Sequence, residues 1–219
     1  MVKVIPIKQG SDDWLEYRRG KITGSKLGNI YSRRKNSAPK EGFYDLMGEL
    51  LKAAPITADL YDFELDGKPF SMIERGHLLE PEALRLFAKR HNKKLVMDSV
   101  VWVSDFDDRI MISPDAWVEG DPITEAVEAK CPGTKVVLRC YIEEAYPDEY
   151  KEQVLQYFVV NDDLQTLWFI IYTDVVPGLG LQVFEIKRED LDDEIEAMKE
   201  FEIETLDKID ELIKGMEEK

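Results

Sequence analysis

The chain has 219 residues, which is long enough for one sizeable hydrophobic core and lies within the usual size range of a single domain. Its 44% hydrophobic and 34% charged residues are ordinary for a globular protein in water, and no stretch is apolar for long enough to cross a membrane. Two cysteines and two histidines cannot supply a four-thiolate iron–sulfur cluster and argue against a structural zinc site. Any metal should therefore have mainly oxygen ligands, as Mg²⁺, Mn²⁺ and Ca²⁺ do.

The charge of the chain is unevenly distributed. The net charge of −16 argues at first against a nucleic-acid partner, but residues 1–52 carry eleven Lys/Arg and six Asp/Glu, a local balance of +5. Residues 185–219 carry six basic and fifteen acidic residues, and the segment between the two is also acidic. A chain of this kind can present a basic face to DNA while its acidic residues face solvent. The first ten residues lack the apolar region of a secretory signal, so we expect a cytoplasmic protein.

The first half of the chain is predicted to be mainly helical. Ser11 and Asp12 are typical N-cap residues, and the apolar residues of 76–91 recur at helical spacing. A basic segment at 33–42 and a segment from Pro55 to Pro69 are predicted as loops. The predicted helices are 11–19, 23–32, 43–53 and 76–91.

The second half is predicted to contain a sheet. Turn residues at 105–108 and 120–122 separate apolar segments of strand character. The predicted strands are 94–103, 109–118, 123–130, 166–173 and 181–187, and the predicted helices are 148–161 and 189–214. Together these elements predict a mixed α/β sheet flanked by helices. We expect one domain over 1–219, with a helical part at about 1–92, a sheet core at about 93–190 and a C-terminal helix at about 189–216.

Three ionisable residues, Asp115, Glu128 and Lys130, fall on strands that should be buried. Residues i and i+2 of a strand share a face, so Glu128 and Lys130 should point the same way. If the strands at 109–118 and 123–130 form the hairpin that their turn predicts, Asp115 lies beside this pair. Two carboxylates and an ammonium would then converge at one place on the sheet.

Such a group suits phosphodiester hydrolysis. Carboxylates can hold Mg²⁺, which lowers the pKa of a bound water and neutralises charge that develops on the phosphate. A lysine can orient the attacking water or stabilise the transition state. An isolated Glu-x-Lys is more often a surface ion pair, but Asp115 one hairpin upstream favours the functional interpretation.

The run Ser113-Pro114-Asp115, followed by Glu128-Ala129-Lys130-Cys131-Pro132, resembles the PD-(D/E)xK nuclease motif. More narrowly, the chain resembles the phage alkaline exonucleases of the lambda type, the YqaJ-like viral recombinase family. Four further segments support this: QGSDDWLEYRRGKITGS at 9–25, GHLLEPEA at 76–83, Gln153 in EYKEQVLQY, and the strand at 166–173. The resemblance covers roughly residues 9–190 and implies a restriction-endonuclease-like mixed sheet core flanked by helices.

The resemblance also implies roles for individual residues. Glu80, Asp115 and Glu128 would be metal ligands, together with the backbone carbonyl of Ala129. Lys130 would be the catalytic lysine, and Gln153 would position water or the scissile phosphate. Two of these residues also have a simpler interpretation. Glu80 can be a carboxylate in the first turn of a helix, where it interacts favourably with the helix dipole, and Gln153 can be a solvated helix residue.

A second implied site binds the 5′-phosphate of a DNA end through Arg18, Thr23 and Ser25, with Ser113 as a further candidate. This pocket also makes physical sense by itself, because a guanidinium offers paired donors to phosphate and the start of a helix favours anions. The simpler alternative is that Arg18 pairs with a neighbouring aspartate, Asp12 or Asp13.

Other residues are expected to have no role in the chemistry. We interpret His77 and His91 as surface residues, Trp14 mainly as a packing residue and Cys131 as a packed thiol. Two departures from the family pattern, Gly24 and Ala116, remove no functional group.

The function implied by the resemblance is a Mg²⁺-dependent 5′→3′ exonuclease, with Mn²⁺ as a substitute metal. It would act on double-stranded DNA with a 5′-phosphorylated end and leave 3′ single strands for recombination by annealing. The family further implies a homotrimer around DNA, a single-strand annealing protein as partner, and a phage or prophage origin in a bacterial cytoplasm. Two alternatives remain open: an endonuclease or junction resolvase with the same PD-(D/E)xK chemistry, and a non-catalytic DNA- or partner-binding module that kept the fold.

Overall fold

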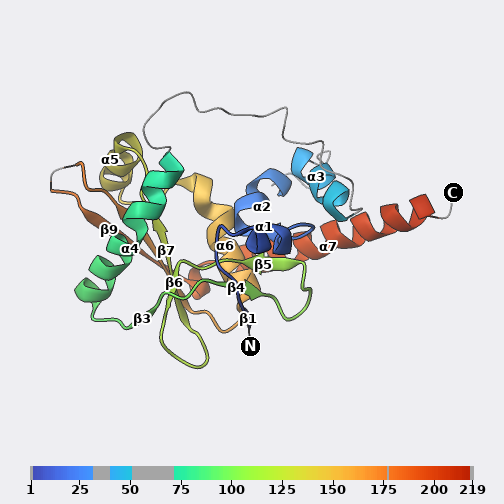
Figure 1. Cartoon of the computed structure of the whole chain (residues 1–219), viewed down its shortest axis with the longest axis horizontal. Helices are drawn as coiled ribbons and strands as arrows, with labels where there is room; N and C mark the ends of the chain where they lie inside the picture. The colour runs from blue at the N-terminus through green and yellow to red at the C-terminus, as the bar shows by residue number, and fades with distance from the viewer. Residues whose placement is uncertain (1, 32–39, 51–71, 177, 218–219) are drawn as a thin grey trace.

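A computed structural model describes residues 2–31, 40–50, 72–176 and 178–217 (Figure 1). Its strands form two sheets, of order β1-β4-β5-β2 and β3-β6-β7-β8-β9. The strands are β1 (Lys3–Pro6), β2 (Ile22–Thr23), β3 (Leu95–Val96), β4 (Val100–Val103), β5 (Ile110–Ile112), β6 (Ala116–Val118), β7 (Glu125–Lys130), β8 (Thr166–Tyr172) and β9 (Leu181–Lys187). The helices are α1 (Asp12–Tyr17), α2 (Gly24–Ile30), α3 (Glu41–Leu50), α4 (Met72–His91), α5 (Thr134–Glu143), α6 (Lys151–Val160) and α7 (Asp192–Glu217), with 3₁₀ turns η2 (Asp148–Tyr150) and η3 (Arg188–Asp190).

The five-stranded sheet is covered on both faces. One face packs on α4 through Ala83 and Phe87, which join Val127 of β7 and Ile170 of β8 in one apolar cluster. The other face packs on α6 and α7 in a larger cluster that also reaches the four-stranded sheet. Strand β7 lies antiparallel to β6 and parallel to β8, so the sheet is mixed. The expected mixed α/β fold flanked by helices is therefore confirmed.

Two predicted strands are each divided between the two sheets. The segment 94–103 forms β3 in one sheet and β4 in the other, and the segment 109–118 forms β5 and β6 in the same way. Pro114 lies at the second division, where its lack of an N–H prevents a continuous ladder of hydrogen bonds. The division places Asp115 at the point where the chain passes from one sheet to the other.

The N-terminal part contains helices α1 to α4, but it also contributes two strands that the sequence did not predict. Strand β1 pairs antiparallel with β4, and β2 pairs parallel with β5, so the four-stranded sheet draws half of its strands from this part of the chain. Both strands are short, and their pairing with distant residues leaves little local signal. A helical pattern expected to return after Pro132-Gly133 corresponds to α5, and Ser11 caps α1 as expected, accepting a hydrogen bond from Trp14 N at 3.2 Å. The loop predictions at 33–42 and from Pro55 to Pro69 fall largely outside the described residues.

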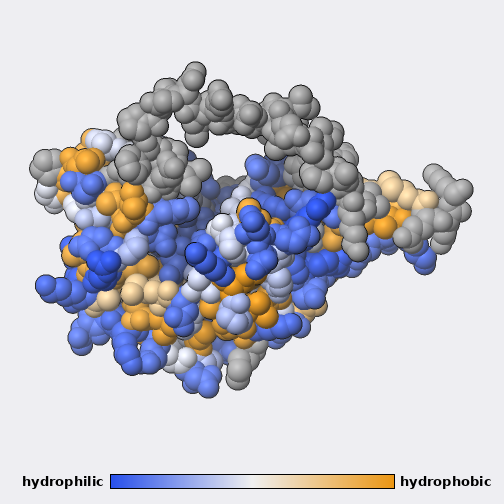
Figure 2. Space-filling model, in the orientation of Figure 1, coloured by the Kyte–Doolittle hydropathy of each residue, from blue (hydrophilic) through white to orange (hydrophobic). Residues whose placement is uncertain are grey.

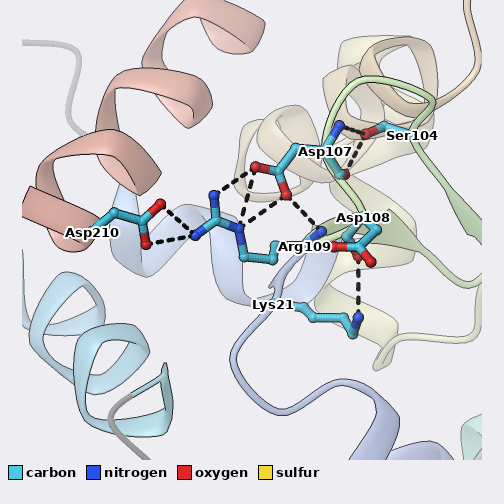
Figure 3. Close-up of polar contacts among 6 residues, drawn as sticks. All are labelled: Lys21, Ser104, Asp107, Asp108, Arg109 and Asp210. Atoms are coloured by element: carbon cyan, nitrogen blue, oxygen red, sulfur yellow. Dashed lines mark hydrogen bonds and ion pairs between the residues drawn. The ribbon is translucent and has the colours of Figure 1, made fainter. Parts of the chain in front are cut away.

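An arginine joins the four-stranded sheet to the C-terminal helix. Arg109, which precedes β5, donates to both carboxylate oxygens of Asp107 and, at 2.8 and 2.9 Å, to those of Asp210 on α7 (Figure 3). In the same region Lys21 Nζ donates to the carbonyl oxygen of Asp108 at 3.1 Å. The turn between β4 and β5 is thus tied both to α7 and to the segment that leads into β2.

Helix α5 exposes an apolar face. Leu138, Tyr141 and Ile142 are 41%, 60% and 76% exposed, while Val137 and Cys140 on the opposite side are buried. Hydrophobic residues gather at this end of the molecule in Figure 2. No helix in the described ranges is both long and apolar enough to span a bilayer.

A buried carboxyl group lies between α6 and α7. Glu202 of α7 is 0% exposed, and neither of its oxygens has a hydrogen-bond partner among the described residues. Burial raises the pKa of Glu202 well above its usual range, and contact with the Gln156 side chain lowers this pKa only in part. Between the ordinary carboxyl pKa and this raised value, the folded chain binds more protons than the unfolded chain. The free energy of unfolding therefore falls as pH rises through that interval.

We predict that Glu202→Gln stabilises the protein at pH 8 by about 1–3 kcal/mol, because it removes the cost of keeping an ionisable group buried and unpaired. The gain should shrink as pH falls towards 4.5, the ordinary glutamate value, where the unfolded wild-type chain is also protonated. Urea denaturation at several pH values measures both effects. Glu204→Gln, an exposed position on the same helix, is the matched control and should change little; equal effects of the two substitutions would contradict the prediction.

Candidate active site

The predicted group of Asp115, Glu128 and Lys130 is assembled where β6 and β7 begin to pair. Ala116 lies opposite Val127, so the preceding Asp115 comes beside Glu128. One oxygen of Asp115, Oδ2, accepts a hydrogen bond from the backbone N–H of Ala129 at 2.8 Å. In the hairpin expected from the sequence, only the second part of the predicted strand 109–118, which is β6, pairs with β7. This pairing brings the three side chains together.

Three donors hold the carboxylate of Glu128. Lys130 Nζ and Gln153 Nε2 both donate to Oε1, the latter at 2.5 Å, and the hydroxyl of Tyr157 donates to Oε2. Glu128 is only 1% exposed, so these donors replace the water that the charge has lost. Gln153 thus contacts Glu128, and its role in positioning water or the scissile phosphate stays a prediction.

Tyr157 was missed by the sequence analysis. It lies four residues after Gln153 on α6, and this spacing places both side chains on one face of the helix. The same spacing could have suggested the residue, but a tyrosine in an apolar helix normally indicates core packing. Its ring does pack in the core, with its centroid 6.2 Å from that of Trp102.

The electrostatics of the group reflect burial and close negative charges. Burial raises the pKa of Asp115 well above its usual range, and the charges of Glu128 and Glu80 raise it further. The pKa of Glu80 is raised for the same reasons, burial first and Glu128 second. Burial alone would lower the pKa of Lys130, but the charges of Glu128 and Asp115 outweigh it and raise that pKa. Lys130 is therefore protonated at neutral and alkaline pH.

Glu80 and Asp115 are suited to a divalent cation. Both border the same cavity, and a bound cation would favour the charged forms that burial and the neighbouring carboxylates disfavour. Mg²⁺ is commonly bound by one or two carboxylates and several waters. In the described part of the chain, however, no group of three or more His, Cys, Asp or Glu side chains is close enough to hold a metal ion. Glu128, whose oxygens accept the three hydrogen bonds above, and the carbonyl of Ala129 stay predictions as further ligands.

Arg18, Thr23 and Ser25 form a second group. Arg18 Nη2 donates to Thr23 Oγ1 at 2.9 Å and to Ser25 Oγ at 2.5 Å, rather than to the neighbouring aspartates that were the simpler alternative. Burial lowers the pKa of Arg18, and the charge of Glu49 partly opposes this. The hydroxyl partners leave the positive charge of the guanidinium available to an anion.

Trp14 links this group to Ser113. Its indole Nε1 donates to Ser113 Oγ at 3.0 Å, and the guanidinium of Arg18 lies 4.1 Å from the centroid of its ring. Trp14 is a packing residue, as expected, because it packs against the apolar cluster of Val101, Val103 and Met111. It also contacts two predicted site residues, Arg18 and Ser113. Tyrosine and tryptophan side chains with one polar atom often combine packing with such a contact.

One cavity of about 530 Å³ borders both groups. Of the predicted site residues, all but Thr23 line it: Arg18, Glu80, Ser113, Ser25, Asp115, Glu128, Ala129, Lys130 and Gln153. Thr23 is fully buried behind Arg18. Further lining residues that the sequence analysis did not assign to the site include Gln9, Trp14, His77, Cys131 and Tyr150.

Residues 13–163 match the family described as YqaJ-like viral recombinase domain. The chain belongs to this family. The resemblance drawn from the sequence is therefore confirmed, and the matched range contains every predicted site residue. No curated protein matches this chain significantly.

The fold of this YqaJ-like protein is that of known alkaline exonucleases. Two crystal structures of LHK-Exo, an alkaline exonuclease from Laribacter hongkongensis, one of them in complex with dAMP, superpose with a TM-score of 0.71. Each is 20% identical and covers 95% of this chain and 99% of its own. A phage-related exonuclease from Haemophilus somnus is 18% identical, with a TM-score of 0.50, over 90% of this chain and 96% of that one. At these identities the likeness establishes the fold.

We predict that Tyr157→Phe lowers kcat by about tenfold and leaves the KM for DNA nearly unchanged. A hydrogen bond to a charged group contributes about 1.5–3 kcal/mol, and its loss leaves Oε2 of Glu128 without this donor. Steady-state hydrolysis of duplex DNA measures both constants. Tyr172→Phe, on β8 and outside the cavity lining, is the control. An unchanged kcat would show that the hydroxyl does not position Glu128.

Proposed function

We propose that this chain is a Mg²⁺-dependent DNA exonuclease. It degrades one strand of double-stranded DNA in the 5′→3′ direction from a 5′-phosphorylated end and leaves 3′ single-stranded overhangs. The observation that supports this most directly is the single cavity that borders both the carboxylate–lysine group and Arg18. A 5′-phosphate held by Arg18 would place a nearby phosphodiester beside Asp115 and Lys130.

The residues of the chain have separable tasks in this proposal. Glu80 and Asp115 hold Mg²⁺, with Glu128 and the carbonyl of Ala129 as predicted further ligands. Mg²⁺ bound there supplies a Lewis acid for the phosphate and a water of lowered pKa. Lys130, kept protonated by its carboxylate neighbours, stabilises negative charge on the phosphate, and the amide of Gln153 orients Glu128 and water. Mn²⁺ prefers similar oxygen ligands and would substitute.

Recognition of the end rests on the Arg18 group. A guanidinium can donate two parallel hydrogen bonds to a phosphate, and the hydroxyls of Ser25 and Ser113 add neutral donors beside it. Trp14, which contacts both Arg18 and Ser113, keeps these donors in place.

The wider role that we propose is recombination by strand annealing. The 3′ overhangs would be passed to a single-strand annealing protein, and a homotrimer would enclose the DNA. A ring of this kind resolves the conflict with the net charge of −16, because the basic N-terminal residues can face the DNA while the acidic residues face solvent.

The decisive test compares end-labelled linear duplex DNA with closed circular duplex DNA in Mg²⁺ and in chelator. We expect nucleotides to be released from linear DNA in Mg²⁺ only, at a rate that Asp115→Asn and Lys130→Met lower by about 100-fold or more. The exposed positions Asp98→Asn and Lys89→Met are the matched controls.

Two outcomes would contradict the proposal. Cutting of closed circles as fast as linear DNA would indicate an endonuclease or resolvase. Equal residual hydrolysis in wild type, Asp115→Asn and Lys130→Met would indicate a non-catalytic binding module.

A separate prediction concerns Arg18. Arg18→Lys keeps the charge but removes the paired donor geometry, so we expect the preference for a 5′-phosphate over a 5′-hydroxyl end to fall about tenfold. The measurement is the ratio of kcat/KM on two duplexes that differ only in this group. Arg85→Lys, in an exposed ion pair on α4, is the control. An unchanged ratio for Arg18→Lys would remove Arg18 from end recognition.

A further inference from the structure

The turn that carries Arg18 is held from behind by helix α3. Residues 18–21 join α1 to β2, and Gly20 in this turn has a φ of +68°, a conformation that favours glycine. The backbone N–H of Gly20 donates to Glu49 Oε2 at 2.7 Å. A side-chain carbon added at Gly20 would lie 3.1 Å from Leu50 Cδ2, so α3 approaches the turn closely.

Glu49 also pairs with a lysine beside the Arg18 group. Lys26 Nζ lies 2.8 and 2.7 Å from the two carboxylate oxygens of Glu49 and 3.5 Å from the carbonyl oxygen of Arg18. Lys26 follows Ser25 directly on α2, so this ion pair joins α3 to the helix that carries Ser25. One carboxylate thus contacts the segments on both sides of the arginine–hydroxyl group.

The contacts at the other end of α3 fix its distance from α2. A side-chain carbon at Gly42 would lie 2.7 Å from the carbonyl oxygen of Asn29, which leaves no room for a larger residue. On its other side the turn is held by Lys21, which donates to the carbonyl of Asp108 (Figure 3). Glu49 thus supplies a side-chain hydrogen bond from α3 to the backbone of this turn.

We propose that Glu49 is a positioning residue that sets the preference of the enzyme for a 5′-phosphorylated end. It does not line the cavity, so it acts through the turn at Gly20 and through Lys26. With Glu49 in place, the guanidinium of Arg18 stays fixed against Thr23 and Ser25. Lys26 is neutralised by its ion pair with Glu49, whereas Arg18, which lines the cavity, keeps its charge beside hydroxyl partners. This inference rests on the proposed function and adds the residue that gives its phosphate pocket a fixed geometry.

The experiment measures kcat/KM for two duplexes that differ only in a 5′-phosphate or a 5′-hydroxyl. For Glu49→Ala we expect the ratio to fall about tenfold through a higher KM on the phosphorylated end, with kcat at saturation nearly unchanged. Glu49→Gln keeps an oxygen that can accept from Gly20 N–H and should recover most of the ratio. Glu119→Ala, which removes a carboxylate from the ion pair with Lys94 outside the cavity lining, is the matched control.

Both duplexes are assayed with one preparation of each variant. A partly unfolded variant therefore hydrolyses both duplexes more slowly, and the ratio of the two kcat/KM values is unaffected. A wild-type ratio well above one together with an unchanged ratio in Glu49→Ala would overturn this inference alone. A wild type that degrades linear DNA with no preference between the two ends would overturn the phosphate pocket and this inference with it. If Glu49→Gln lowers the ratio of kcat/KM values as much as Glu49→Ala does, the effect comes from the charge on Lys26. The proposed action of Glu49 through the N–H of Gly20 would then be overturned.

Discussion

The buried carboxylate of Glu128 is the group on which the rest of the site depends. A charge that is 1% exposed is tolerated only when donors replace its lost hydration, and here Lys130, Gln153 and Tyr157 do so. Two of these donors lie on α6 and the third on β7. Helix α6 must therefore lie close to Glu128 of β7 for these hydrogen bonds to form, and Gln153 of this helix lines the cavity.

Two further carboxyl groups, those of Asp115 and Glu80, are partly buried beside Glu128. Asp115 and Glu80 lie close to Glu128, and their pKa values are raised by burial first and by the charge of Glu128 second. A divalent cation bound beside these carboxylates, as proposed above, would favour their charged forms and would stabilise the folded chain. Burial and neighbouring carboxylates thus disfavour the charged forms of Asp115 and Glu80, whereas the carboxylate of Glu128 has hydrogen-bond donors from the chain itself.

The Arg18 group is held by neutral partners, unlike the charged group around Glu128. Arg18 is held by hydroxyls, an indole and a turn, and its partners are neutral, so its charge remains available to a phosphate. Strand β2 and the turn before it are positioned by the four-stranded sheet, while β7 belongs to the five-stranded sheet. The cavity lies where these sheets meet, because the chain crosses from one to the other at Pro114 and Asp115.

The sequence alone determined the family, and it predicted five residues that the structure places around one cavity. Asp115, Glu128, Lys130, Gln153 and Arg18 were predicted from residue type, from the two-residue spacing on a strand, and from motif resemblance. It also predicted the helices with strong periodicity, since that signal is local. Only the tertiary structure decided that the strands form two sheets, that β1 and β2 join one of them, and that Tyr157 and Trp14 fix the site residues. These features depend on contacts between residues far apart in the chain, such as Trp14 with Ser113, and no local pattern encodes such contacts.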